Sequence, residues 1–581
     1  MTDGPQRRPR KKGRRRDRDG GALAGLESLV PDGRDRRVLL VADAAQRREL
    51  VPWLERFSKD RVCVVSADEA PEWDLAGRQV EHRACADLAT VVKHVRMLDA
   101  PHIVVSVLPS DLLPTGAEDQ LDLFAALFRF VRRDGAYILD RLATGPRLEG
   151  LPEWLHLLAA AEDRSLRDSL GPRQTELASA VGTFAVSRDA VVVTKRVEHL
   201  VKLRDAELNR ILPAREPDLT LAELDKRPGG ELTSRARVTS HTALVDISMP
   251  SVIAYPELTT RHYSGQVALG GASLMYAGHT VLPDSFRWHL TDNPSNPNLR
   301  SESRRFARVP SASRPRRTLT GDYYQLESTY PHHFGHLMTE VVSRLWGWEA
   351  AKREIPDLKA IFQLKTKSRR DPRLERTLFT AYGISEADLV WVNEPVFVES
   401  VVAATPMWHN APPHYVHPDI VETWDRLAAG LVRDAGRGPH ERIFVSRGAG
   451  AKHRECRNAV EVEEFFRARG FEIVYPELLS LPEQVVLFRD ARVVAGFGGS
   501  AMFNLMFAKS VETVVLLSHE AYTARNEHLY TSLTGGDVHY FWSRPDVEHP
   551  EGGWSQEAFT AAWEFDFGRN GDELAQVLAQ A

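Results

Sequence analysis

The chain has 581 residues, 43% of them hydrophobic and 27% charged, which is the composition of an ordinary globular protein. About two to four domains are expected at this length, and the net charge of −5 gives no reason to expect nucleic acid as a partner. The three cysteines are far apart, which excludes a disulfide framework and a four-cysteine zinc site and fits a reducing compartment.

Residues 1–34 are predicted to form a disordered basic arm. Residues 1–20 hold nine Lys and Arg against three Asp and have almost nothing apolar to bury. The arm is either a solvated tail or a peripheral contact with anionic membrane lipid, since each cation near such a surface contributes about 1 kcal/mol; nucleic-acid binding is the remaining alternative. It lacks the apolar part of a secretory signal, and no run approaches the roughly 20 apolar residues of a membrane span. We therefore expect a cytoplasmic protein, with the inner membrane face as the alternative location.

Residues 35–200 are predicted to form a doubly wound α/β domain. Short β-branched runs alternate with helical stretches, and the rhythm resembles the later half of a class I methyltransferase fold. The first loop of that family is rich in glycine, whereas this chain has Ala44, Ala45 and Gln46 there. The resemblance is therefore to a degenerate member. A structural or acceptor-binding role is expected, with methylation of the same polymer as an alternative. The expected strands are 37–42, 61–66, 102–108 and 136–139.

Three further parts are predicted. Residues 201–317 have many turn signals and indicate a mixed linker with short antiparallel strands. Residues 318–435 and 436–581 each alternate strands with helices, which predicts two facing Rossmann-like units with a cleft between them. The first of these units should contain a long helix over about 333–355.

The segment 491–504 is the clearest candidate for ligand binding. A buried strand runs into Gly496, Gly498 and Gly499, and a helix is expected to begin at Ser500. Glycines allow close backbone approach, and the amides at a helix start suit a diphosphate. Ser500 is expected to cap the helix and to reach a phosphate oxygen. The alternative is a plain tight turn.

Two arginines strengthen the diphosphate interpretation. Arg447 follows the strand 442–446 at the edge where ligands bind in parallel sheets, and Arg457 and Asn458 precede the next helix. Guanidinium groups there could neutralise a leaving diphosphate in place of a metal ion. The alternative is that both arginines are solvated on the surface.

A second constellation lies in the predicted helix. His333, His336 and Glu340 are spaced by three and four residues, so they share one face, with Arg344 one turn further on. His336 or Glu340 is expected to deprotonate an acceptor hydroxyl or to orient the base. A structural His–Glu pair and a zinc site are the alternatives, although the segment is not the His-Glu-x-x-His motif.

These segments resemble glycosyltransferase family 61 over about residues 250–545, and the resemblance does not cover residues 1–200. The helix around His336 is similar to the Tyr-Tyr-His-Trp-Leu-x-Glu helix of that family. The resemblance implies a GT-B-like fold, with the first unit on the acceptor side and the second on the nucleotide-sugar side. It further implies inverting, metal-independent sugar transfer without a cofactor, from a nucleotide sugar to a glycan or other hydroxyl acceptor. Bacterial relatives are linked to surface polysaccharides. The matching residues include Arg447, Arg457, Asn458, Glu461, Gly496, Gly499, Asn504 and Phe507.

The motifs that match the family also imply a role for individual residues. Arg447 and the 496–504 turn, including Asn504, would hold the donor. His336 and Glu340 would face the acceptor, together with His333 and Arg344.

Two departures from the family pattern favour an alternative. Phe497 and its neighbours stand where the family has a histidine near the donor phosphates, and Leu516 and Leu517 replace an acidic residue at a strand end. His519 or Glu520 is a candidate to take over that role. The alternative is a non-catalytic protein that keeps the fold and binds a glycan or a synthase partner.

Overall fold

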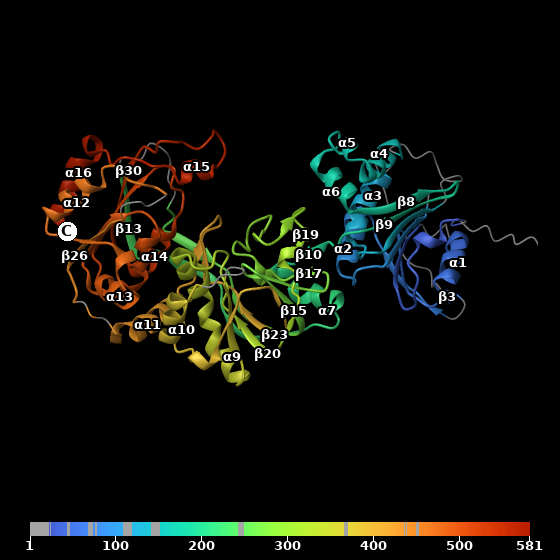
Figure 1. The fold of residues 1–581 in the computed structure, drawn as a ribbon, viewed down its shortest axis with the longest axis horizontal. Helices are drawn as coiled ribbons and strands as arrows, with labels where there is room; N and C mark the ends of the chain where they lie inside the picture. The colour runs from blue at the N-terminus through green and yellow to red at the C-terminus, as the bar shows by residue number, and fades with distance from the viewer. Residues whose placement is uncertain are drawn as a thin grey trace, which may run out of the picture. The chain divides into compact units, whose positions relative to one another are not determined.

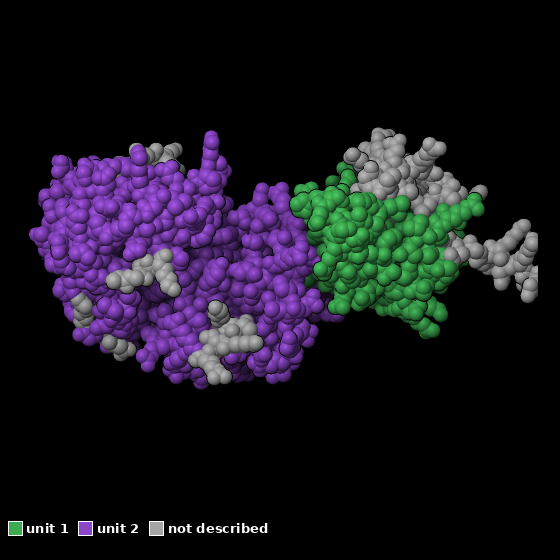
Figure 2. Space-filling model, turned by 45° about the horizontal axis from the view of Figure 1, so that its top comes forward, with its two compact units in different colours: residues 1–201 green, residues 202–581 purple. Residues whose placement is uncertain are grey.

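The structure is a computed structural model that describes residues 23, 25–42, 47–67, 74–75, 78–107, 119–140, 151–241, 249–364, 370–434, 436, 438–448 and 453–581. The chain divides into two compact units, residues 1–201 and 202–581, which are coloured separately in Figure 2. Most of the expected basic arm and the loop at Ala44, Ala45 and Gln46 lie outside the described residues.

The first unit is built on a seven-stranded sheet in the order β5-β2-β1-β6-β7-β9-β8. Strands β1, β2, β5, β6 and β7 pair in parallel, while β9 pairs antiparallel with β7 and β8. Their β-branched runs are buried, as expected for parallel strands covered on both faces. The strand order reverses beside β1, where open α/β sheets bind ligands. The strands are β1 (Arg37–Val41), β2 (Arg61–Ser66), β5 (Glu81–Ala84), β6 (Ile103–Val107), β7 (Ala136–Asp140), β8 (Val181–Val186) and β9 (Ala190–Lys195).

Helices and short strands complete the first unit, with a core of its own that includes Leu40, Phe57, Val64 and Ile138. They are α1 (Arg47–Arg56), β3 (Asp74–Leu75), β4 (Arg78–Gln79), α2 (Leu88–Arg96), α3 (Asp119–Leu127), α4 (Leu151–Glu162), α5 (Arg164–Arg167) and α6 (Pro172–Ala180), with short 3-10 turns at Glu27–Leu29 and Phe128–Phe130.

The second unit begins with an eleven-stranded mixed sheet. Its parallel part is β23-β20-β21-β22, and β15 joins it through antiparallel pairing with β23. Residues 201–317, expected to be a linker with short strands, supply most of the antiparallel part, and β15 is 14 residues long. The strands are β10 (Leu200–Lys202), β11 (Thr220–Arg227), β15 (Leu258–Gly271), β16 (Leu274–Ala277), β17 (Thr280–Val281), β18 (Arg300–Ser301), β19 (Phe306–Arg308), β20 (Thr318–Gln325), β21 (Lys359–Gln363), β22 (Leu389–Val392) and β23 (Val396–Ala404).

The sequence predicts one long α-helix after β20, but the helical stretch found there changes its winding along its length. It consists of α8 (Phe334–His336), the π-helical turn η7 (Leu337–Val341), the 3-10 turn η8 (Val342–Gly347) and α9 (Trp348–Glu354). Hydroxyls compete for its backbone, because Thr339 donates to the carbonyl of Gly335 at 2.8 Å and Ser343 to that of Glu340 at 3.0 Å. Single π turns of this kind are frequent at functional sites.

A second sheet of six parallel strands follows, in the order β13-β30-β29-β28-β26-β27. Figure 1 shows β13 (green) beside β30, although these strands lie about 300 residues apart in the chain. The strand β13 comes from the expected linker. One edge strand of this sheet therefore precedes, in the chain, most strands of the eleven-stranded sheet. The strands are β13 (Ala236–His241), β26 (Arg442–Val445), β27 (Glu472–Val474), β28 (Val493–Phe497), β29 (Thr513–His519) and β30 (Gly536–Ser543).

Both sheets of the second unit share a hydrophobic core whose residues run from Ile253 to Trp542. The fold is therefore a mixed α/β fold with several parallel sheets, which confirms the predicted class at that level. No helix within the described ranges is long and apolar enough to cross a membrane. The remaining elements are η4 (Asp205–Glu207), α7 (Leu208–Arg215), β12 (Gly230–Thr233), β14 (Val252–Tyr255), η5 (Pro283–Ser285), η6 (Ser311–Ser313), α10 (Arg373–Tyr382), η9 (Glu386–Asp388), β24 (Trp408–His409), β25 (Tyr415–Val416), α11 (Ile420–Leu431), η10 (Val432–Asp434), α12 (Ala459–Arg467), η11 (Pro476–Leu478), α13 (Leu481–Asp490), η12 (Ser500–Phe507), α14 (Asn526–Thr534), α15 (Gln556–Phe559) and α16 (Phe567–Gln580).

Candidate functional site

His336 and Glu340 are in contact, as their spacing predicts. Nδ1 of His336 is hydrogen-bonded to Oε1 of Glu340. The other carboxylate oxygen accepts the backbone N–H of Thr329 at 2.6 Å, and Arg287 lies 3.0 Å from Oε1. Both carboxylate oxygens are therefore engaged.

These contacts separate the roles that the two side chains can take. Burial favours the neutral carboxyl of Glu340, but Arg287 and His336 outweigh burial and lower its pKa to about 2. A carboxylate so strongly ionised is a poor proton acceptor at neutral pH. Its contact favours the His336 tautomer that carries the proton on Nδ1, which leaves Nε2 with a lone pair. The geometry thus makes His336 the candidate base and Glu340 the residue that orients it.

His333 is the residue before α8, at the N-cap position but without a side-chain capping hydrogen bond, rather than lying within a long helix. Its ring packs edge-on against that of His336 at 4.7 Å between centroids. Burial, followed by the charges of His336 and Arg287, lowers the pKa of His333. Within the part of the chain that the structure describes, no group of three His, Cys, Asp or Glu side chains is placed to hold a metal ion. A zinc ion bound by Glu340 would have to lie beside its carboxylate, and the guanidinium of Arg287 already lies there.

Arg344 is buried and serves the fold around Glu340. Its Nη1 donates to the carbonyl of Ala404 at 3.1 Å. It lines a small cavity of about 10 Å³, room for about one water molecule. The other lining residues are Ser273, Arg287, Thr339, Glu340, Pro406, Trp408 and Asn410.

The glycine turn after β28 differs from the expected helix start. The N-cap residue is Gly499, with φ at 146°, and no side chain caps the 3-10 helix η12, so Ser500 does not serve as the cap. The N–H of Gly499 is not open to solvent but donates to Oε1 of Glu527 at 2.7 Å. The chain's own carboxylate therefore lies at the position predicted for an anionic ligand.

Two arginines stand over this turn. A Cβ atom on Gly499 would overlap the guanidinium of Arg447 and lie 3.2 Å from Nη2 of Arg454. Arg447 donates to the carbonyls of Gly498 at 2.6 Å and His453 at 3.0 Å. Burial, followed by the charge of Arg454, lowers the pKa of Arg447 to about 10.

Arg454 is held between aromatic rings in an unusual backbone conformation. Its guanidinium lies 4.7 Å from the ring centroid of Tyr522 and 5.4 Å from that of Phe559. Its φ is 56°, a region that side chains other than glycine seldom occupy. Among the described residues, Nε of Arg454 is buried without a hydrogen-bond partner.

His519 lies in the same cluster, at the end of β29. Neither ring nitrogen has a hydrogen-bond partner in the described structure, and the side chain is buried. Burial, then Arg454 and Arg447, lower its pKa to about 3. Glu520, the other candidate, instead pairs with Arg569 at 3.2 Å.

The two predicted constellations meet at Gly335. A Cβ atom built on Gly335 would lie 3.0 Å from Cβ of Ser500 and 3.1 Å from the ring of Phe503. The helix that carries His336 therefore packs directly on the turn that carries Gly499. The charge of Arg454 also contributes to the lowered pKa of His333, across the same contact.

Three predicted donor residues lie elsewhere or serve the fold. Arg457 pairs with Asp546, and its backbone N–H donates to Trp563 at 2.9 Å, which holds it away from the turn. Arg457 and Asn458 line an open cavity of about 740 Å³ together with Arg544 and Arg569. The amide of Asn504 donates to Gln484 at 2.9 Å and to the carbonyl of Ala501 at 3.1 Å, so it ties η12 to α13.

Phe497 points into the core rather than toward the turn. It packs edge-on against Phe444 at 5.2 Å and Trp563 at 6.0 Å. The phenylalanine that stands here in place of the family's histidine therefore fills a hydrophobic cluster, and its ring does not lie over Gly499.

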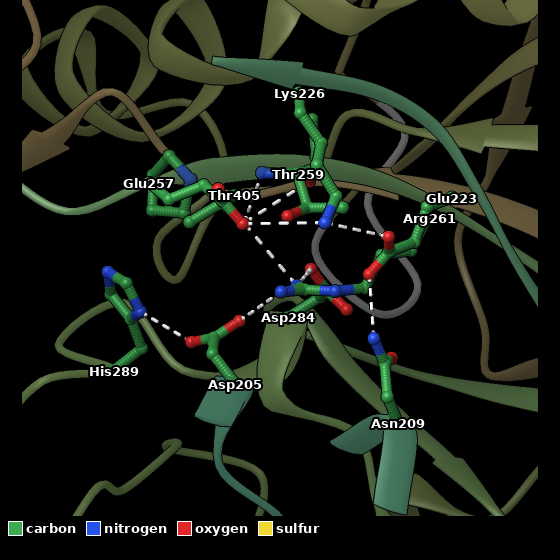
Figure 3. A network of polar contacts seen from close by, with 12 residues as sticks. Asp205, Asn209, Glu223, Lys226, Glu257, Thr259, Arg261, Asp284, His289 and Thr405 are labelled. Atoms are coloured by element: carbon green, nitrogen blue, oxygen red, sulfur yellow. Dashed lines mark hydrogen bonds and ion pairs between the residues drawn. The ribbon is translucent and has the colours of Figure 1, made fainter. Parts of the chain in front are cut away.

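A buried polar network supports the segment that carries Arg287 (Figure 3). Arg261 on β15 contacts Asp205 at 2.7 Å and Asp284 at 3.2 Å. Asp205 also contacts His289 at 2.7 Å, two residues beyond Arg287. Because Asp284 and His289 flank Arg287 in sequence, the network fixes both ends of the segment that reaches Glu340.

Sequence reasoning missed Arg287, Arg454 and Glu527. Arg287 follows the segment 281–286 that already resembled the family, which was an available signal. Arg454 stands between Arg447 and Arg457 in the sequence, and only the fold separates the three arginines. Glu527 has no local signal, because its partner Gly499 is 28 residues away.

Residues 334–516 match the sequence profile of the family described as Glycosyltransferase 61. The chain contains a glycosyltransferase family 61 domain. This domain includes His336, Glu340, Arg447, Arg454 and Gly499, whereas Arg287, His519 and Glu527 lie outside the matched residues. No curated protein sequence matches the chain.

Solved structures of methyltransferases are distantly similar to part of the chain. The MycE methyltransferase from the mycinamycin biosynthetic pathway, in complex with Mg, SAH and mycinamycin VI, has 17% identity and a TM-score of 0.23, over 28% of this chain and 45% of that one. The antibiotic-resistance methyltransferase Kmr has 14% identity and a TM-score of 0.20, over 30% of this chain and 92% of that one. The chain thus spans less than half the length of MycE. At such low scores, these similarities identify no activity for this chain.

Proposed function

We propose that the glycosyltransferase family 61 domain of this chain transfers a sugar, with inversion, from a nucleotide sugar to a hydroxyl of a glycan or other acceptor. In this proposal the second unit provides a GT-B-like pair of Rossmann-like folds. The donor diphosphate lies over the Gly498–Ser500 turn, with Arg447 and Arg454 balancing its charge. The observation that carries the proposal is the direct packing of Gly335 against Ser500 and Phe503.

The chemistry follows from the side chains on either side of that contact. Nε2 of His336 takes the proton of the acceptor hydroxyl while the oxygen attacks the anomeric carbon and the nucleoside diphosphate leaves. Glu340 holds Nδ1 of His336 and stabilises the charged ring that results. Arg447 and Arg454 stabilise the negative charge that develops on the leaving diphosphate, so no metal ion is required in this scheme.

A thermal-shift screen against UDP-glucose, GDP-mannose, dTDP-glucose and the free nucleoside diphosphates, with and without divalent metal, tests the proposal. A ligand at about 100 times its dissociation constant stabilises the folded state by about 2.7 kcal/mol. We expect a metal-independent rise with one nucleotide, lost in Arg454→Ala and kept in the surface variant Arg489→Ala. Release of the diphosphate on addition of acceptor glycans then measures transfer.

One observation favours a second function, a non-catalytic glycan-binding or scaffold protein. The chain's own groups fill the predicted anion position, since Glu527 takes the Gly499 amide and Arg447 the Gly498 carbonyl. Absence of a thermal shift with every nucleotide would overturn the transferase proposal in favour of this alternative.

A further inference from the structure

Glu527 is an unusual occupant of the turn at Gly499. Its side chain is buried, and Oε1 accepts both the Gly499 N–H at 2.7 Å and the hydroxyl of Tyr522 at 3.3 Å. Glu527 is also in the first turn of α14, where backbone amides point toward negative charge. The carboxylate thus accepts the Gly499 N–H from the first turn of α14.

The charges around this carboxylate do not balance. Arg447 donates its hydrogen bonds to two backbone carbonyl oxygens. Nε of Arg454 has no hydrogen-bond partner within the described residues. The partly exposed guanidinium groups of Arg447 and Arg454, together with Arg525, therefore stand against two carboxylates, those of Glu527 and Glu477. A more highly charged anion at Gly499 would neutralise this cluster better than Glu527 does.

We propose that Glu527 takes the place of a donor phosphate oxygen on the Gly499 N–H, and that donor binding displaces its carboxylate and leaves it protonated. This inference rests on the proposed function of the same turn. A carboxylate moved off the amide in a buried site next to a diphosphate would meet like charge, so it takes up a proton from solvent. Burial already raises the pKa of Glu527, against the opposing effects of its own backbone N–H, the Gly499 N–H, Arg454 and Tyr522.

A measurement must distinguish proton uptake by Glu527 from proton uptake by the titratable groups around it. Arg447, Arg454 and Arg525 remain charged at neutral pH, and burial raises the pKa of Tyr522 so that it remains neutral. His519 and His333 have lowered pKa values, and a bound anion would raise both. These two histidines are therefore the competing sites of proton uptake.

Calorimetry of the full-length protein tests the inference. A nucleotide sugar identified by the screen is titrated at pH 6.5 and 7.5 in buffers of different ionisation enthalpy, which gives the number of protons taken up. The diphosphate of a nucleotide sugar is esterified at both ends and does not itself titrate in this range. The variant is Glu527→Gln, which keeps the shape and the amide acceptor. The control is Glu176→Gln, a buried carboxylate of the first unit that pairs with His199 and Arg129.

We expect the wild type and Glu176→Gln to take up about one proton more per bound nucleotide sugar than Glu527→Gln does. Wild-type affinity should fall with rising pH by up to about tenfold per unit, whereas Glu527→Gln should bind more tightly and with a flatter pH profile. Zero proton uptake by the wild type overturns the inference, whether or not the variant folds. Equal uptake by the wild type and Glu527→Gln assigns the proton to a histidine and also overturns it. Binding by neither protein overturns the proposed function, and the inference with it.

Discussion

His336 and Glu340 form a hydrogen-bonded pair, and in the proposed function only His336 exchanges a proton with the acceptor. We predict that His336→Asn lowers kcat by about 10²- to 10⁴-fold while nucleotide affinity stays within about twofold. Glu340→Gln should lower kcat without abolishing binding, because Gln cannot stabilise a charged ring. Single-turnover kinetics and the thermal shift separate the two effects. The control is His440→Asn, a half-exposed partner of Glu472; a loss of nucleotide binding in His336→Asn would contradict the assignment.

The pKa of Glu340 gives a further prediction with a definite sign. Its pKa in the folded protein, about 2, lies below its ordinary value near 4.5. The stability that the ionised carboxylate contributes is therefore present above about pH 4.5 and lost as the pH falls toward 2. In Glu340→Gln, the fall in unfolding free energy over this acid range should be smaller than in the wild type, as measured by urea unfolding at several pH values.

At the residue scale, spacing in the sequence predicted contacts between residues of one helical turn. It could not predict contacts between residues that are far apart in the sequence. The four-residue spacing of His336 and Glu340 was sufficient, because both lie in one helical turn. Arg457 looked equivalent to Arg447, yet the bridge between Cys456 and Trp563 turns it toward Asp546. The burial of Glu527 against Gly499 depends on the register of β28 and β29, which no local pattern encodes.

At the scale of elements, the approach of α8 to η12 depends on the missing side chain of Gly335. We predict that Gly335→Ala lowers kcat/KM by about tenfold or more, because an added Cβ atom would push His336 away from the turn. Crowding of this kind should also destabilise the fold by about 1–3 kcal/mol. The control is Gly171→Ala, where an added Cβ atom would meet nothing within 4 Å. Activity equal to the wild type in Gly335→Ala would show that the contact does not position the site.

The network around Arg261 ties β15 to η4 and η5 and offers a contrast between buried and exposed charge. Arg261→Ala would leave Asp205 and Asp284 without their cation, and we expect a loss of about 3–5 kcal/mol in unfolding free energy. Arg61→Ala removes a pair with Asp35 in which both side chains are more than half exposed, and it should change stability little. Equal effects in denaturant unfolding would contradict a supporting role for the network.

At the scale of the whole molecule, alternation of strands and helices predicted the mixed α/β class, but it could not predict which strands share a sheet. Residues 201–317 have short runs and many turns, which favoured a linker. Their strands nevertheless pair with β23 and β30, since pairing between distant segments depends on burial that appears only in the folded chain.

This pairing predicts where the chain can be divided. We expect residues 200–581, which keep β10 whole, to fold cooperatively and to keep nucleotide binding, because residues 202–581 form one compact unit with its own core. Residues 436–581, which match the sequence-based boundary, lack β13 and would expose the edge of β30 and the indole N–H of Trp542, which donates to Ser240. That shorter fragment should aggregate or remain unfolded in circular dichroism and size-exclusion experiments. A soluble, cooperatively folding 436–581 fragment would show that β13 is dispensable to the sheet that carries Gly499.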